Sequence, residues 1–364
     1  MHDFNVSSPW AIQPEYLMRL CEVADAHART ATGAPQSLTA RGGLSESPMV
    51  CVTDGVAVID LVGPLTKGYS WVTAMFGGTS MVGAGALIDQ AVSDPTVKGI
   101  LLNIDSPGGS VDGTEGLVGA IRRAGEQKPV VSLASGTMAS AAYWAGSAAG
   151  AVYLDSGTTI VGSIGVVSRH VDISGLESRI GIKTTEITAG KFKRIASMHE
   201  PLSAEGRGSI QAQLDHIYSI FVHAVADHRR APVQTVLDRM ADGRVFIGQQ
   251  AVDAGLVDGF SSRGELIERL RTGGMQATKP QPTRKVFMSD REIRQAAFDE
   301  VGPHGSSAQY QAAMKRISAG SGSTEPSCPV TGLTADEKLQ KAKAYAEAHG
   351  VDLVQALKSL GYAK

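Results

Sequence analysis

The sequence of 364 residues predicts an α/β fold in which helices cover a parallel sheet. Apolar runs of strand length occur at 55–64, 99–105 and 129–134. Stretches with helical patterning, at 83–93 and 113–126, separate these runs. The repeated order of strand, loop, helix and strand is typical of parallel α/β units whose strands are buried on both faces.

The elements of this core follow one another between residues 51 and 271. The first apolar run closes with a Gly-Pro pair, and the second closes with Ser106-Pro107-Gly108-Gly109. The third run leads directly into a turn of small residues at Ser140. A long helix is predicted from Ser203 to Arg229. Its helical spacing is carried by Ile210, Leu214, Ile217, Phe221 and Val225. The core is predicted to close with 243–248 and 251–258.

Both ends of the chain are predicted to lie outside this core. Residues 1–50 form an N-terminal helix beginning at Pro14 and a tether rich in Gly, Ser and Pro at 32–48. The composition changes at Thr272, so we expect a linker with a short helix over 272–333. A capping box at Thr334 then begins a helical hairpin at 334–364.

Composition narrows the function. The net charge of −2, from 34 basic and 36 acidic residues, gives no electrostatic basis for binding nucleic acid or an anionic membrane. The three cysteines lack metal-ligand spacing, so we expect no metal and no cofactor, and thiols in a reducing compartment. The N-terminus lacks the pattern of a secretory signal, and no apolar run is long enough to span a membrane. We expect a cytoplasmic protein without a membrane anchor.

Ser140 and Lys193 are the residues most indicative of chemistry. A serine hydroxyl is a weak nucleophile, so a nearby base must take its proton. A lysine amine can do this when burial or a neighbouring cation lowers its pKa. A serine on a small-residue turn with a lysine downstream therefore predicts a hydrolase that uses a Ser-Lys dyad in place of a catalytic histidine, and suggests peptide-bond hydrolysis.

Four segments carry a resemblance to a known family. They are Asp105-Ser106-Pro107-Gly108-Gly109, Met138-Ala139-Ser140-Ala141-Ala142-Tyr143, Gly162-Ser163-Ile164-Gly165-Val166 and Gly190-Lys191-Phe192-Lys193. In this order they resemble the signal peptide peptidase A family of serine peptidases, over roughly residues 55–260. The resemblance implies the Clp/crotonase-like fold, a spiral of ββα units, here with a helical C-terminal extension.

The resemblance also assigns roles to residues. Ser140 matches the nucleophile and Lys193 the general base. Gly109 and Ala141 match the residues whose backbone N–H groups form the oxyanion hole, and Ser163 is expected to orient the lysine. The family often has glycines where this chain has Ala141 and Ala142, but small residues are kept.

Other assignments stay open beside this one. Lys191 competes with Lys193 as the base, although the aromatic residue before Lys193 and the later Glu200-Pro201 favour Lys193. A Ser-His-Asp triad of the Clp protease type would require His170, which lies beyond the position expected for it. A crotonase-type hydratase would require a pair of catalytic carboxylates, for which no pair is convincing.

Among family members, the chain looks like the head-maturation proteases of tailed phages and prophages. This resemblance implies a protease that cuts scaffold and head proteins, and itself, inside the procapsid. It implies a homo-oligomeric ring in which neighbouring subunits share the dyad, and a C-terminal segment that docks scaffold or capsid proteins. A host cytosolic enzyme that degrades peptides, and an inactive peptidase fold serving as capsid scaffold, remain as alternatives.

Overall fold

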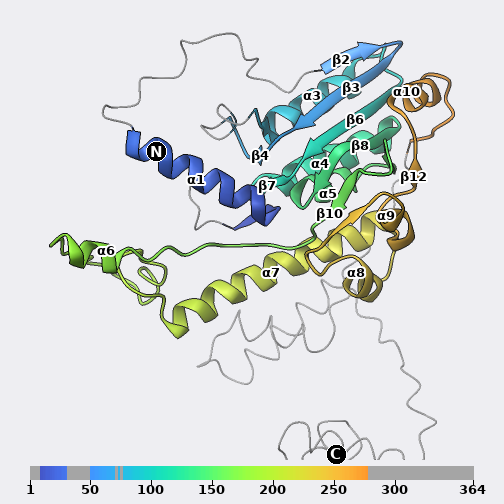
Figure 1. Cartoon of the computed structure of the whole chain (residues 1–364). Helices are drawn as coiled ribbons and strands as arrows, with labels where there is room; N and C mark the ends of the chain where they lie inside the picture. The colour runs from blue at the N-terminus through green and yellow to red at the C-terminus, as the bar shows by residue number, and fades with distance from the viewer. Residues whose placement is uncertain (1–8, 31–49, 70–72, 74–76, 278–364) are drawn as a thin grey trace, which may run out of the picture. The chain divides into compact units, whose positions relative to one another are not determined.

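The fold is taken from a computed structural model that describes residues 9–30, 50–69, 73 and 77–277 (Figure 1). The chain divides into two compact units, Met1–Gln281 and Pro282–Lys364. The described residues all belong to the first unit. The expected tether at 32–48, the helix within 272–333 and the hairpin at 334–364 lie outside the described residues.

The main sheet is built around parallel strands, as the sequence predicts. Its order is β11-β10-β8-β6-β3-β2, with antiparallel pairing only at the two edges, between β11 and β10 and between β2 and β3. The strands are β2 (Val50–Thr53), β3 (Val56–Val62), β6 (Gly99–Ser106), β8 (Val130–Ala139), β10 (Ile160–Gly162) and β11 (Val245–Ile247). Off this path, β9 (Ala151–Leu154) pairs with β8 and with β12 (Gly259–Phe260).

A second sheet of four short strands gives the fold its repeating unit. Its order is β1-β7-β4-β5, formed by β1 (Trp10–Ile12), β4 (Leu65–Thr66), β5 (Thr79–Ser80) and β7 (Gly108–Ser110). The chain passes from β3 in the main sheet to β4 in the second, and then into α3 (Met81–Ser93). It repeats this path from β6 to β7 and into α4 (Thr114–Gln127). The predicted α/β class and its ββα units are confirmed.

Helices cover both faces of the main sheet. The larger core packs strand residues such as Ile59 and Ile104 against α3, α4, α5 (Ala141–Gly146) and the end of α7 (Ala204–Arg229). Within it, Trp144 stacks on Phe221 with ring centroids 4.5 Å apart. The opposite face packs against α10 (Arg263–Arg271), whose capping box is made by Ser262 and Glu265. Helices α8 (Val233–Arg239) and α9 (Gln249–Ala254) complete this unit.

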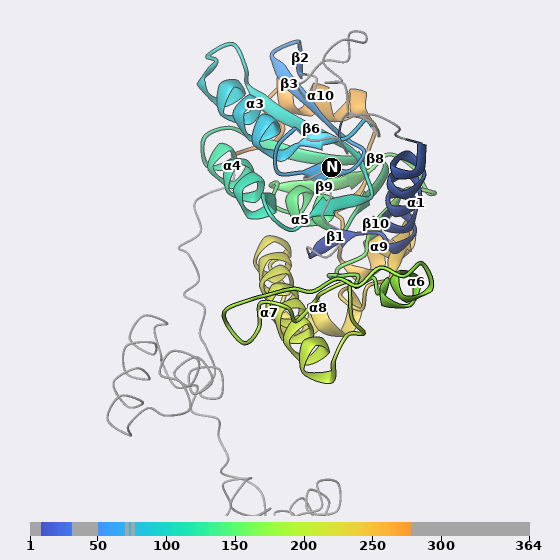
Figure 2. The same ribbon diagram turned by 90° about the vertical axis from the view of Figure 1, so that its left-hand side faces the viewer.

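Helix α7 has the predicted bounds but only partly the predicted packing. Phe221 and Val225 are buried, whereas Ile210, Leu214 and Ile217 are only partly buried. The apolar stripe of its N-terminal half therefore stays partly uncovered. Residues 168–202, which we call the arm, connect β10 to this helix and contain α6 (Ser174–Arg179) (Figures 1 and 2).

Candidate active site

Ser140 occupies a strained turn between a strand and a helix. It follows the last residue of β8 and caps α5, with φ 54° and ψ −117°. A residue with a side chain rarely adopts this backbone conformation, which costs on the order of 1–3 kcal/mol and is typical of functional sites. The serine is only 1% exposed. The sequence thus presents a hydroxyl on a sharp strand-to-helix turn, the geometry of a nucleophile elbow.

The segment 162–165 wraps around this serine. The Ser140 N–H donates to the Gly162 carbonyl at 2.7 Å, and its hydroxyl donates to the Gly165 carbonyl at 3.4 Å. Ser163 lies between these two contacts, is 5% exposed and also has a positive φ of 52°. Its N–H donates to the Arg244 carbonyl at 2.8 Å. The structure therefore brings Ser163 to the nucleophile turn, on the segment that contacts Ser140.

The residues expected to form the oxyanion hole also lie at this turn. Ala141 is the first residue of α5, where backbone N–H groups have no acceptor within the helix. Gly109 lies at the centre of β7, between β4 and β1. A Cβ at Gly109 would come 1.8 Å from the Leu65 carbonyl oxygen, so only glycine allows this approach of the backbones.

Asp105 shapes the same region rather than adding an acid to it. Its carboxylate accepts a hydrogen bond from the Thr137 N–H at 2.9 Å, three residues before Ser140. The bond ties the end of β6 to the end of β8, where the register of their pairing shifts. Asp105 thereby fixes the approach to the nucleophile turn.

Lys193 does not lie at this turn within one chain. It is exposed, and its backbone N–H donates to Gly190 inside a turn of the arm. That turn is fixed to the start of α7 by an ion pair between Lys191 and Glu205 at 2.6 Å. Both views place the start of α7 away from α5, whose first turn follows Ser140 (Figures 1 and 2). Four of the five expected site residues are thus brought together, and the lysine is not.

The arm itself is held by polar contacts. Arg194 pairs with Glu186 at 3.1 Å and with Glu200 at 2.8 Å, and His199 pairs with Glu177 at 2.8 Å. A hydrogen bond from Ser197, and then the charge of Arg194, lower the pKa of Glu186. Large apolar side chains of the arm stay exposed, and they are Val171, Leu176, Ile180, Ile182, Ile187, Phe192 and Met198.

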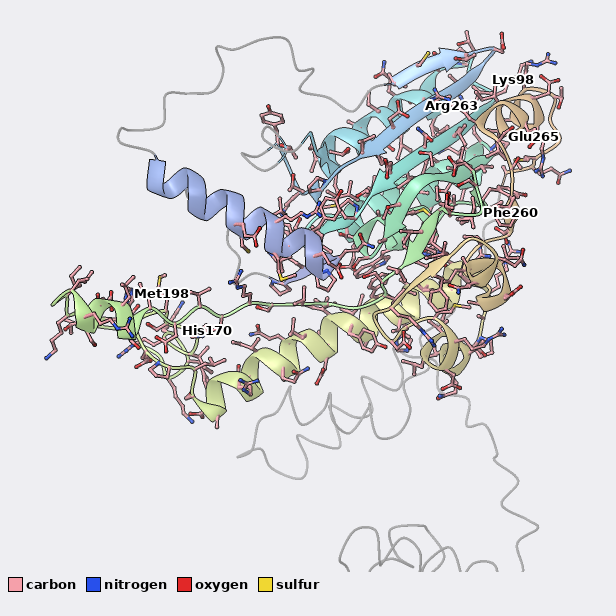
Figure 3. All side chains as sticks on the ribbon, in the orientation of Figure 1. Lys98, His170, Met198, Phe260, Arg263 and Glu265 are labelled. Carbon is pink, nitrogen blue, oxygen red and sulfur yellow. The ribbon has the colours of Figure 1, made fainter. Side chains whose placement is uncertain are left out.

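The histidine alternative finds no support in this geometry. His170 lies on the arm near Met198 (Figure 3), where its ring bonds to the Ser197 carbonyl at 2.9 Å. His228 bonds instead to the Ser147 hydroxyl at 2.9 Å, at the end of α5. Burial, followed by the charges of Arg122 and Arg229, lowers the pKa of His228 to about 3. Within the described ranges, no histidine shows a hydrogen bond to Ser140.

A polar support under α5 was missed by sequence reasoning. The Tyr143 hydroxyl donates to the Leu256 carbonyl at 2.8 Å, and burial raises the pKa of Tyr143. Arg229 donates to the nearby Gly255 carbonyl and forms a two-point ion pair with Asp258 at 2.8 and 3.0 Å. Asp258 also accepts from the β9 backbone at 2.7 Å. In the sequence, these contacts fall on the Gly-Leu-Val-Asp segment that ends at Asp258.

A serine on a strained strand-to-helix turn of an α/β fold, beside backbone N–H groups, is the arrangement of a serine hydrolase site. Residues 122–276 match the family model of peptidase family S49. This match includes the nucleophile turn, the arm and α7.

The chain is also similar to several individual proteases and phage proteins. The chain is 33% identical over 220 residues to the capsid assembly protease C of Escherichia phage lambda, covering 60% of this chain and 49% of that protein. It is 33% identical over 231 residues to the head-tail preconnector protein GP5 of Enterobacteria phage P21, covering 64% and 46%. Protease 4 of Salmonella typhi is 34% identical over 186 residues, covering 50% and 29%. The chain thus spans about half the length of the two phage proteins.

Among solved structures, the chain is similar to an enoyl-CoA hydratase/isomerase family member, with a TM-score of 0.33 at 14% identity over 77% of this chain and 90% of that one. A membrane-bound stomatin-specific protease gives a TM-score of 0.37 at 12% identity over 62% and 86%. Across the described residues, no helix is long and apolar enough to cross a membrane, and no cluster of three or more potential metal ligands occurs.

Proposed function

We propose that this protein is a serine endopeptidase in which Ser140 is the nucleophile and Lys193 of a neighbouring subunit is the general base. The observation that carries the proposal is Ser140 itself, held in a strained conformation on a strand-to-helix turn within the residues that match peptidase family S49. Backbone strain of this kind costs stability and clusters at functional sites.

The reaction follows from these groups. The Ser140 oxygen bonds to the substrate carbonyl carbon while its proton passes to the Lys193 amine. The N–H groups of Gly109 and Ala141 stabilise the negative oxygen that forms, each worth about 3 kcal/mol. The proton then passes to the leaving amine as the peptide bond breaks. A water molecule then attacks the carbonyl carbon of the acyl group while Lys193 takes its proton. The bond to the Ser140 oxygen breaks, and the proton passes from Lys193 to that oxygen.

The position of Lys193 favours a base supplied across a subunit interface. A lysine amine acts as a general base where burial or a neighbouring cation lowers its pKa, so Lys193 must lose its contact with solvent before it acts. The arm that carries Lys193 exposes seven large apolar side chains, Ile187 with 95% of its surface exposed. Packing of the arm against a neighbouring copy would cover these side chains and desolvate the lysine together.

The named relatives support a role in phage head assembly. Two of them are the lambda capsid assembly protease and the P21 head-tail preconnector protein. We propose scaffold and head proteins, and the chain itself, as substrates, with action in the cytoplasm of a bacterial host and inside the procapsid. The segment 334–364 is proposed to dock scaffold or capsid proteins.

The test is the intact mass of the full chain and of Ser140→Ala and Lys193→Ala, alone and with phage scaffold and head proteins. Fragments are expected from the wild type and from neither variant. Lys183→Ala is the matched control, because Lys183 is an exposed lysine elsewhere on the arm. Its fragments are expected to equal those of the wild type.

Mixing the two inactive chains tests the shared site. Mixed rings of Ser140→Ala and Lys193→Ala contain some interfaces with both functional groups, so partial activity is expected to return. No recovery in verified mixed rings would place the base within one chain. Uncleaved chains and uncleaved substrate for all three proteins would instead indicate an inactive fold that serves as scaffold.

A further inference from the structure

Strand β1 lies against the candidate site and is held along both of its edges. On one edge it pairs antiparallel with β7, where Ala11 lies opposite Gly109. On the other edge, Trp10 exchanges two backbone hydrogen bonds with Val167, each 2.8 Å long. Val167 follows the segment that wraps around Ser140. The N-terminal strand therefore pairs with the site's glycine strand on one edge and with the residue before the arm on the other.

The register determines which backbone groups meet. In an antiparallel pair, residues alternate between hydrogen-bonded and non-hydrogen-bonded positions. The bonded pairs on either side of Ala11 and Gly109 are Gln13 N–H to the Pro107 carbonyl at 2.9 Å and Val111 N–H to the Pro9 carbonyl at 3.4 Å. Both lie two residues away, so Ala11 and Gly109 also form a bonded pair. The Gly109 N–H thus points at the Ala11 carbonyl oxygen.

The same oxygen lies close to the nucleophile turn. A Cβ built at Gly108 would come 2.3 Å from the Ala11 oxygen and 3.0 Å from the Ala139 oxygen. One methyl group at Gly108 would therefore contact both, and Ala139 is the residue directly before Ser140. The Gly109 N–H, which we propose as a donor to the substrate carbonyl, therefore already faces the Ala11 carbonyl of the same chain.

The side chains of β1 lie in two different surroundings. Ala11 has no exposed surface and presents only a methyl group at this position. Trp10 and Ile12 instead pack in a separate cluster with residues of α1 (Pro14–Thr30) and with Val167. The aromatic anchor thus lies beside the site, and the smallest side chain of the strand lies opposite Gly109.

We infer that the cleft between β7 and Val167 binds an extended peptide segment with a small side chain opposite Gly109, and that β1 is its resident occupant. This rests on the proposed function, because Gly109 is there the donor to the substrate carbonyl. A substrate must take the place of β1 before it meets Ser140. A tethered segment competes at an effective concentration on the order of millimolar, so free peptides at lower concentrations are excluded while β1 is docked.

The experiment measures how fast a small fluorophosphonate modifies Ser140 in the full chain, followed by intact mass. Trp10→Ala removes the anchor of β1 and is expected to raise the rate at least tenfold. Ala11→Trp displaces β1 differently, by placing a large side chain where none fits, and is expected to do the same. Tyr16→Ala is the matched control, since Tyr16 is 40% exposed on α1, and its rate is expected to equal the wild type.

A synthetic peptide with the sequence of residues 6–16 tests the small side chain. Added at millimolar concentration to Trp10→Ala, it is expected to slow the modification back toward the wild-type rate. The same peptide with Trp in place of Ala11 is expected to leave the rate unchanged. Equal protection by both peptides would refute the small-residue requirement.

The outcomes separate this inference from the proposed function. Ser140 modified at one rate in the wild type and both β1 variants would overturn the resident occupant and leave the nucleophile intact. If Ser140 were modified in none of the folded variants, the assignment of Ser140 as the nucleophile would be refuted, and this inference would be refuted with it. Folding of each variant is checked by far-UV circular dichroism beside the wild type.

Discussion

The Ser140 N–H donates to the Gly162 carbonyl at 2.7 Å, and this bond joins the nucleophile turn to the segment that leads into the arm. It extends the parallel pairing of β8 and β10, where Ala139 lies opposite Gly162. Because the arm begins a few residues later, the bond joins the backbone of the nucleophile to the segment from which the arm leaves the sheet. The site and the exposed lysine are therefore parts of one continuous segment.

The strain at Ser140 gives a prediction with an internal comparison. Ser140→Gly and Ser140→Ala both remove the hydroxyl and are expected to remove peptidase activity. Glycine adopts φ 54° and ψ −117° without the steric cost that alanine retains. After allowing for the greater freedom of unfolded glycine, we expect Ser140→Gly to be about 1 kcal/mol more stable than Ser140→Ala. Urea unfolding of the two variants measures the difference, and equal midpoints would argue against strain.

Gly109 is predicted to tolerate no side chain. In Gly109→Ala, the added methyl group would overlap the Leu65 carbonyl oxygen, which belongs to the backbone of β4 and cannot rotate away. We expect a loss of more than about 2 kcal/mol of stability. Gly116→Ala is the control, because its Cβ in α4 meets nothing within 4 Å. A better helix former there should raise stability by roughly 0.5–1 kcal/mol.

Asp258 is predicted to hold the closing segment to the core. Asp258→Ala leaves Arg229 without its ion-pair partner and the Val152 N–H without its acceptor. We expect a loss of about 2 kcal/mol in the free energy of unfolding. Asp112→Ala breaks an exposed pair with Lys67 at 3.1 Å and should cost less than about 1 kcal/mol. Equal losses in the two variants would show that Asp258 is a surface contact only.

His228 is predicted to make stability depend on pH. Its pKa is about 3 in the folded chain against an ordinary value of 6.5, so the unfolded chain binds the proton first. The stability is fully present above about pH 6.5 and is lost as pH falls toward 3. Between pH 7 and pH 5 the loss is about 2 kcal/mol. His228→Gln should lose this share of the pH dependence, whereas His216→Gln, at an exposed position of α7, should retain it.

The elements that the sequence predicted are those with strong apolar runs. Strands β3, β6 and β8 are largely buried, so each forms an apolar run in the sequence. Such runs can be recognised without any knowledge of the tertiary structure. Strands β1, β4, β5 and β7 have two or three residues each, too few for any period to show. Helix α10 was also missed, because only Leu266 and Leu270 of its nine residues are buried.

Part of the candidate site could be proposed from the sequence, because some of its residues lie in recognisable short motifs. Ser140, Gly109 and Ala141 lie in short motifs of small residues, and such turns have few alternatives. The separation of Lys193 from Ser140 was not visible in one chain's sequence, since it depends on the direction in which the arm leaves β10. The position of β1 was likewise hidden, because pairing between residues 11 and 109 spans almost a hundred residues of chain.

Helix α10 sets the boundary for removing the C-terminal part of the chain. Leu266 and Leu270 pack on the sheet face that carries Val58 and Leu101. A cut before Arg263 would strip this face and leave a flat apolar sheet prone to aggregation. A cut after residue 277 leaves the face covered. A mature form that sheds its C-terminal segment must therefore begin its loss beyond the last turn of α10.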